Sequence, residues 1–438
     1  MKVFVKLFFC VVWIFGLVQS IHAQSDSYIY AYMAISQLGD AAEIHLVNPR
    51  EATVESQSFP LPEGLSFSPR IRSLISPDGR WIASTLFAVD QSRIVIHLFN
   101  TERQQEYEIA EGFVASYGRN LAWSHDSRYL ALNIRLLNHN GINLHLYNVE
   151  KEELTKISVD TPLQREIAWS DDNTQLVTIS HSCFPNTACP DSLVLLDTAS
   201  GTEIASASLA ELPFLGNSAC DPRFSPDRRY VSFVSNCGYG VPFSYDFSNE
   251  IYVWHIEDGV LIKITNYAEG QDNSSFQAKY NHVWTDDQTL LIGVNYRNGN
   301  NPEQQRLATY DFIGKMASTL SSEVGAAFET DKKSGNIIFL PHLVFSDQSH
   351  ESEELLRLSN LSSISTVREH SLSIPHTCEA TFSPSGDLVA VVTSKRACSL
   401  SIEGITFISS DASMFQAFPV EADKPYRVGL GWIKQSGR

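Results

Sequence analysis

The stretch AWSHDSRYLAL, residues 122–132, decides the fold, because it recurs along the chain with its residue types in the same order. An apolar residue or Trp precedes Ser or Thr, a turn containing Asp follows, and an apolar strand comes last. The other copies are ISPDGRWIA from Ile75, AWSDDNTQLVT from Ala168, RFSPDRRYVSF from Arg223, VWTDDQTLLIG from Val283, TFSPSGDLVAV from Thr381 and the degenerate AFETDKKSGNIIF from Ala327. Their turns lie 45 to 60 residues apart, a period that indicates a propeller or a solenoid.

The segments between the copies predict β-strands. They are short, rich in Val, Ile, Leu, Tyr and Phe, and bounded by turn residues, as in RIVIHLFN (93–100), INLHLYN (142–148) and EIYVWH (250–255). A weaker strand follows each of them, such as ELTKIS (153–158). No 12-residue segment combines helical periodicity with helix caps. Each copy therefore supplies four antiparallel strands, which is one propeller blade.

The repeat resembles the TolB-like, WD-repeat-like propeller repeats of exported bacterial proteins. The matching residues are Ser76-Pro77-Asp78-Gly79, Ser225-Pro226-Asp227 and Ser383-Pro384-Ser385-Gly386. The resemblance covers nearly the whole mature chain. It implies the fold and leaves the function open, because such repeats serve many roles.

Seven turns predict seven blades, and the two ends of the sequence predict an eighth. The segments YIYAYMAI (28–35), AEIHLVN (42–48) and ATVESQSF (52–59) match the last three strands of a blade. In YRVGLGWIKQ (426–435), Trp432 stands where Trp123, Trp169 and Trp284 stand in their copies. We predict an all-β chain with a single propeller of eight four-stranded antiparallel blades, in which the C-terminal strand completes the N-terminal blade. Seven blades is the alternative, if residues 327–340 or the ends are misassigned.

The N-terminus has the pattern of a secretory signal peptide. Lys2 and Lys6 precede an apolar run over residues 7–18, and Ala23 offers a small residue for cleavage before Gln24. We predict a signal peptide over residues 1–23 and a propeller over residues 24–438, exported to the periplasm or secreted, with no membrane insertion after cleavage. The alternative is an uncleaved anchor helix, for which the run is short.

Six cysteines remain once Cys10 leaves with the signal peptide, and an even number in an exported chain predicts disulfides. Hairpins folded at the Ser-Pro turns would pair Cys220 with Cys237 and Cys378 with Cys398, leaving Cys183 and Cys189 to close a short loop. The alternative is a metal site made of His181, Cys183, Cys189 and Asp191, although the C-x2-C spacing of zinc sites is absent.

Long inserts mark one face of the predicted ring. Residues 181–191, 236–250, 267–281, 296–305 and 342–352 all fall at the blade ends opposite the Ser-Asp turns. We call these ends the long-insert face, and the ends with the turns the turn face. Long loops on a rigid scaffold are common binding sites, and exposed aromatic residues favour contact with a partner. The predicted binding residues are Tyr239, Phe243, Tyr245, Phe247, Asp272, Asn273, Phe276 and Tyr280. The alternatives are tolerated insertions, or aromatics folded back as a small satellite core.

The composition excludes several classes of function. The net charge of −18 argues against a nucleic-acid binder and against docking on an anionic membrane, and a 43% hydrophobic fraction argues against a disordered chain. The sequence contains no G-x-S-x-G elbow, P-loop, H-E-x-x-H or C-x-x-C-H motif. We therefore predict no catalytic residues and no cofactor.

Three histidines at equivalent positions indicate packing between blades rather than a metal site. His45, His97 and His145 occupy the same place in three successive blades, and stacked sheets lie roughly 10 Å apart, too far for shared ligation at about 2 Å. We predict blade-packing positions and no metal. His181, His342, His350 and His376 are further candidates for the long-insert face.

These patterns favour an exported, non-enzymatic binding module, a monomer whose long-insert face contacts a protein, a peptide or a glycan. The alternative is a stand-alone propeller enzyme, a lyase or hydrolase with its site at the central channel. A third possibility is a purely structural part of an envelope complex.

Overall fold

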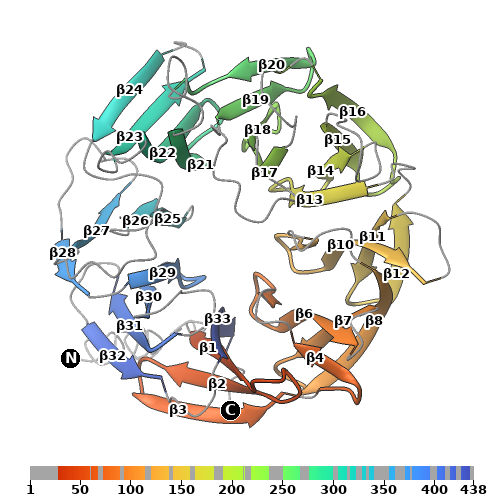
Figure 1. Ribbon diagram of the computed structural model, residues 1–438, viewed down its shortest axis with the longest axis vertical. Helices are drawn as coiled ribbons and strands as arrows, with labels where there is room; N and C mark the ends of the chain where they lie inside the picture. Colours follow the sequence, from red (N-terminus) through yellow and green to blue (C-terminus); the bar gives the residue numbers. More distant parts are fainter. Residues whose placement is uncertain are drawn as a thin grey trace, which may run out of the picture.

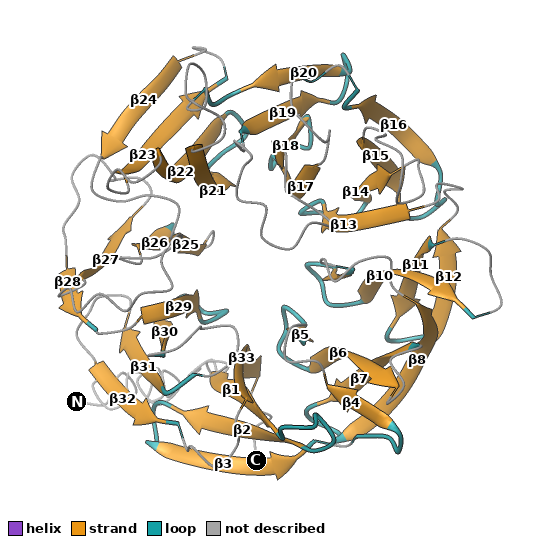
Figure 2. Cartoon of the chain, in the orientation of Figure 1, coloured by secondary structure: helices purple, strands orange, loops and turns teal. Residues whose placement is uncertain are grey.

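The chain forms a ring of antiparallel β-sheets around a common axis (Figure 1). The computed structural model describes residues 28–59, 61–67, 73–88, 93–113, 120–137, 142–157, 163–181, 191–210, 212, 219–235, 250–266, 276–298, 304–312, 316–321, 328–331, 335–339, 355–360, 370–374, 377–394, 402–409, 415–420 and 426–434. Within these residues every regular element is a strand and none is a helix (Figure 2), so no described helix could cross a membrane. The all-β prediction is confirmed.

One sheet joins residues from the two ends of the described chain. Its strand order is β3 (Thr53–Ser58), β2 (Ala42–Asn48), β1 (Tyr28–Ile35) and β33 (Tyr426–Lys434). The pairing of β1 with β33 is antiparallel and runs from Tyr28 opposite Lys434 to Ile35 opposite Tyr426, with a bulge between Ala31 and Tyr32. The C-terminal strand therefore lies beside the first described strand.

Five further sheets have four strands each in sequence order. They are β13 (Leu163–Trp169), β14 (Gln175–His181), β15 (Asp191–Asp197) and β16 (Glu203–Ser208); β17 (Ala219–Phe224), β18 (Tyr230–Ser235), β19 (Ile251–His255) and β20 (Val260–Lys263); β21 (Phe276–Trp284), β22 (Thr289–Asn298), β23 (Gln304–Asp311) and β24 (Met316–Ser321); β25 (Phe328–Asp331), β26 (Asn336–Phe339), β27 (Leu355–Asn360) and β28 (His370–Ser373); and β29 (Thr377–Phe382), β30 (Leu388–Thr393), β31 (Gly404–Ser409) and β32 (Phe415–Pro419). The predicted four-stranded antiparallel unit is confirmed in each.

The remaining strands form one nine-stranded sheet, which the repeat does not predict. They are β4 (Leu65–Phe67), β5 (Leu74–Ile75), β6 (Trp81–Ala88), β7 (Ile94–Asn100), β8 (Gln105–Phe113), β9 (Leu121–Trp123), β10 (Tyr129–Leu136), β11 (Asn143–Asn148) and β12 (Glu153–Ile157). Two repeat units fuse because the end of β8 pairs with β10, Gly112 facing Leu136 and Phe113 facing Arg135. A Cβ on Gly112 would collide with the Arg135 carbonyl, so glycine permits this close pairing.

The Ser-Asp turns share one hydrogen-bond pattern. Ser124 Oγ donates to the Asp126 carboxylate (2.6 Å) and accepts from the Tyr129 N–H (2.9 Å), while Asp126 accepts from the Arg128 N–H (3.1 Å). The pattern recurs in the turns that begin at Ser76, Ser170 and Ser225. The fourth turn residue has a positive φ at Gly79, Ser127, Asn173, Arg228 and Gly386. The predicted turn chemistry is confirmed.

Apolar side chains fill the space between neighbouring sheets. One core joins Leu144 and Leu146 of β11 to Trp169 of β13 and Leu196 of β15. The next core joins Leu193 and Leu195 of β15 to residues of β17, β18 and β19, including Trp254. These cores pack neighbouring sheets against each other.

Candidate functional site

The innermost strands surround the axis of the ring (Figure 1), and β5, β9, β13, β17 and β29 each lead into a turn that begins with Ser. Tryptophans lock neighbouring inner strands together. The indole N–H of Trp169 donates to the Ala122 carbonyl (3.0 Å), and that of Trp432 donates to the Thr381 carbonyl (3.1 Å). In both cases the acceptor lies two residues before the Ser of the preceding turn, as it does for Trp123 and Trp284. Trp432 therefore occupies the predicted place in the repeat.

Once the copies are aligned on these turns, a polar residue stands four positions before the turn in five of the described inner strands or at their entry; Arg72 holds the same position before Ser76 but lies outside the described residues. We call these residues the inner polar ring: Asn120, Glu166, Asp221, Asn281 and Glu379. In β33 the same position holds Gly429, because Trp432 and Ile433 align with Trp123 and Ser124. The ring was not predicted from the sequence, although alignment of the copies reveals it.

Part of the inner polar ring is one continuous network between sheets. The Asp221 N–H donates to the Glu166 carboxylate, and Arg223 Nη2 donates to Asp221 Oδ2 (2.8 Å) and to Asn281 Oδ1 (3.2 Å). Asn281 Nδ2 donates to the Phe328 carbonyl (2.8 Å). The network thus joins β13, β17, β21 and β25, and its carboxylates are engaged in holding the ring together.

His282 is a buried histidine beside this network that the sequence analysis did not single out. Its side chain has no exposed surface, and its Nδ1 lies 4.0 Å from Asp221 Oδ2. Burial, reinforced by the nearby Arg223 charge, lowers the pKa of His282 to about 3. The imidazole is therefore neutral at physiological pH.

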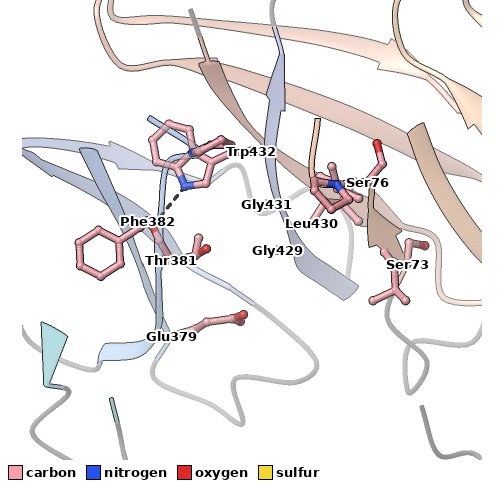
Figure 3. A pocket seen from close by; sticks show the side chains of 13 residues that line it. Ser73, Ser76, Glu379, Thr381, Phe382, Gly429, Leu430, Gly431 and Trp432 are labelled. Carbon is pink, nitrogen blue, oxygen red and sulfur yellow. Dashed lines mark hydrogen bonds between the residues drawn. The ribbon is translucent and has the colours of Figure 1, made fainter. Parts of the chain in front are cut away.

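A pocket of about 300 Å³ opens beside β33, where the inner polar ring lacks a side chain. Gly429 and Gly431 form its floor, Glu379 and Thr381 of β29 one flank, and residues 73–77 the other (Figure 3). Its lining also includes Phe382, Pro384, Leu430 and Trp432. The pocket reaches the turn residues Ser76, Pro77 and Pro384, so it lies toward the turn face.

Two glycines are required in this floor. Gly431 has a φ of +124°, a conformation that only glycine adopts readily. A Cβ on Gly429 would stand 2.6 Å from the Tyr30 hydroxyl oxygen. The floor of the pocket is consequently backbone, and the Tyr30 hydroxyl stands where a side chain at position 429 would begin.

The predicted binding residues fall mostly outside the described residues. These are Tyr239, Phe243, Tyr245, Phe247, Asp272 and Asn273. Phe276 begins β21, where only its backbone is described, and Tyr280 lies half-buried in the same strand.

Tyr280 contacts a buried carboxylate that the sequence analysis missed. Its hydroxyl donates to Glu250 Oε2 (3.1 Å), which also accepts a hydrogen bond from Thr265 Oγ1. Lys263 Nζ lies 3.9 Å from Glu250 Oε1, and the Glu250 side chain is 6% exposed. Glu250 ends the first predicted binding insert, Thr265 stands just before the second and Tyr280 lies near the end of the second, so one carboxylate ties together the bases of both.

The histidines at equivalent places are all buried and have partners within their own sheets. His45 stacks on Tyr32, with 4.6 Å between ring centroids, and His145 Nδ1 lies 3.1 Å from the Asn143 carbonyl. His97 Nε2 lies 3.1 Å from Glu106 Oε2, and burial lowers the pKa of His97 in spite of that carboxylate. Among the described residues, no three His, Cys, Asp or Glu side chains gather as they would around a metal ion. His181 ends β14 with its side chain outside the described residues, as are His342, His350 and His376.

The cysteine pairings remain predictions. Cys183, Cys189, Cys237 and Cys398 lie outside the described residues, and only the backbone of Cys378 is described. Cys220 lies in β17 opposite Val234 of β18, at the edge of a bulge, and Cys378 lies at a similar bulge in β29.

No known family model and no curated protein matches this sequence. Among solved structures, the chain is similar to the dihydro-heme d1 dehydrogenase NirN in complex with DHE (13% identity, TM-score 0.54, 92% of this chain and 75% of that chain). It is similar to an oligogalacturonate lyase in complex with manganese (13%, 0.50, 91% and 98%) and to a Mycobacterium tuberculosis puromycin-hydrolyzing peptidase (13%, 0.51, 80% and 54%). These β-propeller neighbours support the propeller fold and, at this identity, show the fold alone.

Proposed function

We propose that the protein is an exported, non-enzymatic β-propeller binding module, a monomer whose long-insert face contacts a protein, peptide or glycan partner. The observation that carries the proposal is the set of hydrogen bonds that Thr265 and Tyr280 donate to the buried Glu250 carboxylate. Removing a carboxylate from water costs free energy unless it is hydrogen-bonded, and Glu250 receives hydrogen bonds from Thr265 and Tyr280. The bases of inserts 236–250 and 267–281 are thus fixed side by side on the rigid ring, which suits a shared binding surface.

We also propose that the ring has eight blades and is closed by β33. Two observations support this. β33 pairs with β1 along the length of that strand, and the nine-stranded sheet contains two copies of the repeat, with turns at Ser76 and Ser124. Closure by one strand joining three leaves no open sheet edge at the junction.

Export is proposed from the signal-peptide pattern of residues 1–23 and the even number of cysteines in the rest of the chain. Sequencing the N-terminus of the protein recovered outside the cytoplasm tests it, with Gln24 expected as the first residue. Non-reducing peptide mapping tests the three pairings; a peptide joining Cys183 to Cys220 would contradict them.

The binding proposal is tested by affinity capture with immobilised residues 24–438. One variant replaces residues 238–248 with a Gly-Ser linker of equal length, which keeps Cys237 and Glu250. A matched control replaces residues 342–352, another long insert, in the same way. We expect the first variant to lose the captured partner and the control to retain it, with direct binding of the identified partner measured by surface plasmon resonance. Unchanged binding by the 238–248 variant would overturn the assignment of this face.

A further inference from the structure

His97 lies in the interface beside the sheet that holds both ends of the described chain. We call the sheet β3-β2-β1-β33 the closing sheet, because it contains the first and the last described strands. Phe59, directly after β3, shares one apolar core with Val95 and Phe99 of β7. His97 lies on the same face of β7 as these two residues, and its ring centroid is 5.6 Å from that of Phe59. The imidazole is therefore buried where the closing sheet packs against the nine-stranded sheet.

The imidazole has one ring nitrogen with a partner and one without. The His97 side chain is 1% exposed. Its Nε2 lies 3.1 Å from Glu106 Oε2 on β8, whereas its Nδ1 has no hydrogen-bond partner among the residues that the structure describes. A neutral imidazole suits this arrangement, because Nε2–H donates to Glu106 while Nδ1 keeps its lone pair. A protonated imidazole would bring a second N–H donor into the interface, and burying a donor without an acceptor costs free energy.

The charged groups that face His97 come from both sheets, and all of them are carboxylates. Glu106 and Glu108 of β8 lie beside it in its own sheet. Glu55 faces it from the closing sheet, because Glu55 pairs with Leu46, which packs against the shared core. Glu106 and Glu108 favour the protonated imidazole, but burial outweighs them and lowers the pKa of His97.

We propose that His97 is a pH-sensitive latch between the closing sheet and the nine-stranded sheet. The imidazole is neutral while the interface is closed, and it meets water and binds a proton when the interface opens. Acid therefore favours the open form. This latch is independent of the partner surface proposed above, so either can fail without the other.

The pH range of the latch follows from the two forms of the interface. The open form exposes His97, whose pKa then has the ordinary value of 6.5, and the closed form has a lower pKa. The closed form is therefore fully favoured above pH 6.5. Below it, the equilibrium constant for opening rises by up to about tenfold per pH unit, until the pH reaches the lowered pKa of the closed form.

Hydrogen–deuterium exchange of residues 24–438, followed by mass spectrometry at pH 7.5, 6.5 and 5.5, tests the latch. Rates are corrected for the intrinsic pH dependence of amide exchange. Peptides from β1 and β2 report local unfolding of the closing sheet, and peptides from β14 and β15 report a sheet elsewhere in the ring. We expect protection of β1 and β2 to fall by up to about tenfold between pH 6.5 and 5.5, and to fall further than that of β14 and β15. Equal changes in the two regions would overturn the proposal, because a pH effect on the whole fold acts on both alike.

Variants assign the pH dependence to His97. His97→Leu removes the titrating group and keeps an apolar side chain in the interface, so β1 and β2 should then follow the pH dependence of β14 and β15. His145→Leu is the matched control and should keep the wild-type profile, because His145 holds the equivalent place in the next repeat and its Nδ1 lies 3.1 Å from the Asn143 carbonyl. A wild-type pH profile in His97→Leu would contradict the assignment.

A second variant tests the direction of the effect. Glu106→Gln keeps an oxygen that can accept from His97 Nε2 and removes the charge that favours the imidazolium. The pKa of His97 in the closed form should then be lower still. We expect the loss of protection in β1 and β2 between pH 6.5 and 5.5 to be at least as large as in the wild type, and a smaller loss would show that the imidazole is not held neutral by burial.

Discussion

The buried residue His282 makes the stability of the fold depend on pH. Its pKa of about 3 lies below the ordinary value of 6.5. The unfolded chain therefore binds a proton at a pH where the folded chain does not. The contribution of His282 to stability is complete above pH 6.5 and is lost progressively as the pH falls toward 3.

We expect His282→Leu to flatten this dependence. For the wild type, the free energy of unfolding should fall by up to about 1.4 kcal/mol per pH unit from this residue as the medium is acidified. Guanidinium unfolding at pH 7, 6 and 5 measures the slope in a range above the titration of most carboxylates. His125→Gln, an exposed histidine, serves as the control and should keep the wild-type slope. A His282→Leu profile parallel to that of the wild type would show that the imidazole is charged in the fold.

At the scale of the element, the inner strands depend on a repeated indole hydrogen bond. Trp169→Phe and Trp432→Phe each remove one N–H donor and leave the Ala122 or Thr381 carbonyl without it. We expect each variant to lose about 1 kcal/mol of stability, measured as a shift of the unfolding midpoint. Trp81→Phe is the control, because Trp81 lies on β6 and packs against Tyr107, with 5.8 Å between the ring centroids, rather than between inner strands. A normal midpoint for Trp432→Phe beside a lowered one for Trp169→Phe would show that β33 is not held like the other inner strands.

Strands and turns could be predicted because each is encoded locally. The segment INLHLYN carries its apolar residues and its terminal Asn within a few positions, and β11 spans Asn143–Asn148 as expected. Ser124, Asp126 and Tyr129 likewise make their hydrogen bonds within one turn.

The fusion of two sheets could not be predicted in this way. It depends on Gly112 meeting the Arg135 backbone, a contact between neighbouring repeats. The pairing of both β4 and β5 with β6 was also unexpected, because the repeat pattern marks only β5, which leads into the turn at Ser76.

The candidate sites were harder to predict than the fold because they are made by residues from different sheets. Glu379 and Gly429 are unremarkable in their own segments, and the pocket appears only when β29 and β33 stand next to each other. Glu250 and Tyr280 are 30 residues apart and meet through a single hydrogen bond. The aromatic insert that drew attention in the sequence lies outside the described residues, so its role remains a proposal.

At the scale of the whole molecule, β33 links the two ends of the described chain. Val428 and Ile433 lie in the core shared with β1, β2 and β6, while Trp432 lies in the core shared with β30 and β31. Its last backbone N–H, at Lys434, donates to the Gly79 carbonyl (3.3 Å) in the first Ser-Asp turn. This one strand thus contributes side chains to two cores between sheets and makes a backbone contact with a turn.

A chain that ends at Val420 should therefore be much less stable than the full chain. It loses three buried apolar side chains, each contributing about 1.5–3 kcal/mol, and it exposes the edge of β1 to other molecules. We expect a lower melting temperature and concentration-dependent aggregation, measured by differential scanning fluorimetry and light scattering. A synthetic peptide of residues 424–438 added in trans should restore the melting temperature, because the groove for β33 is formed by sheets on both sides, whereas a scrambled peptide should not. A truncated chain that melts like the full chain would show that the ring is held closed without β33.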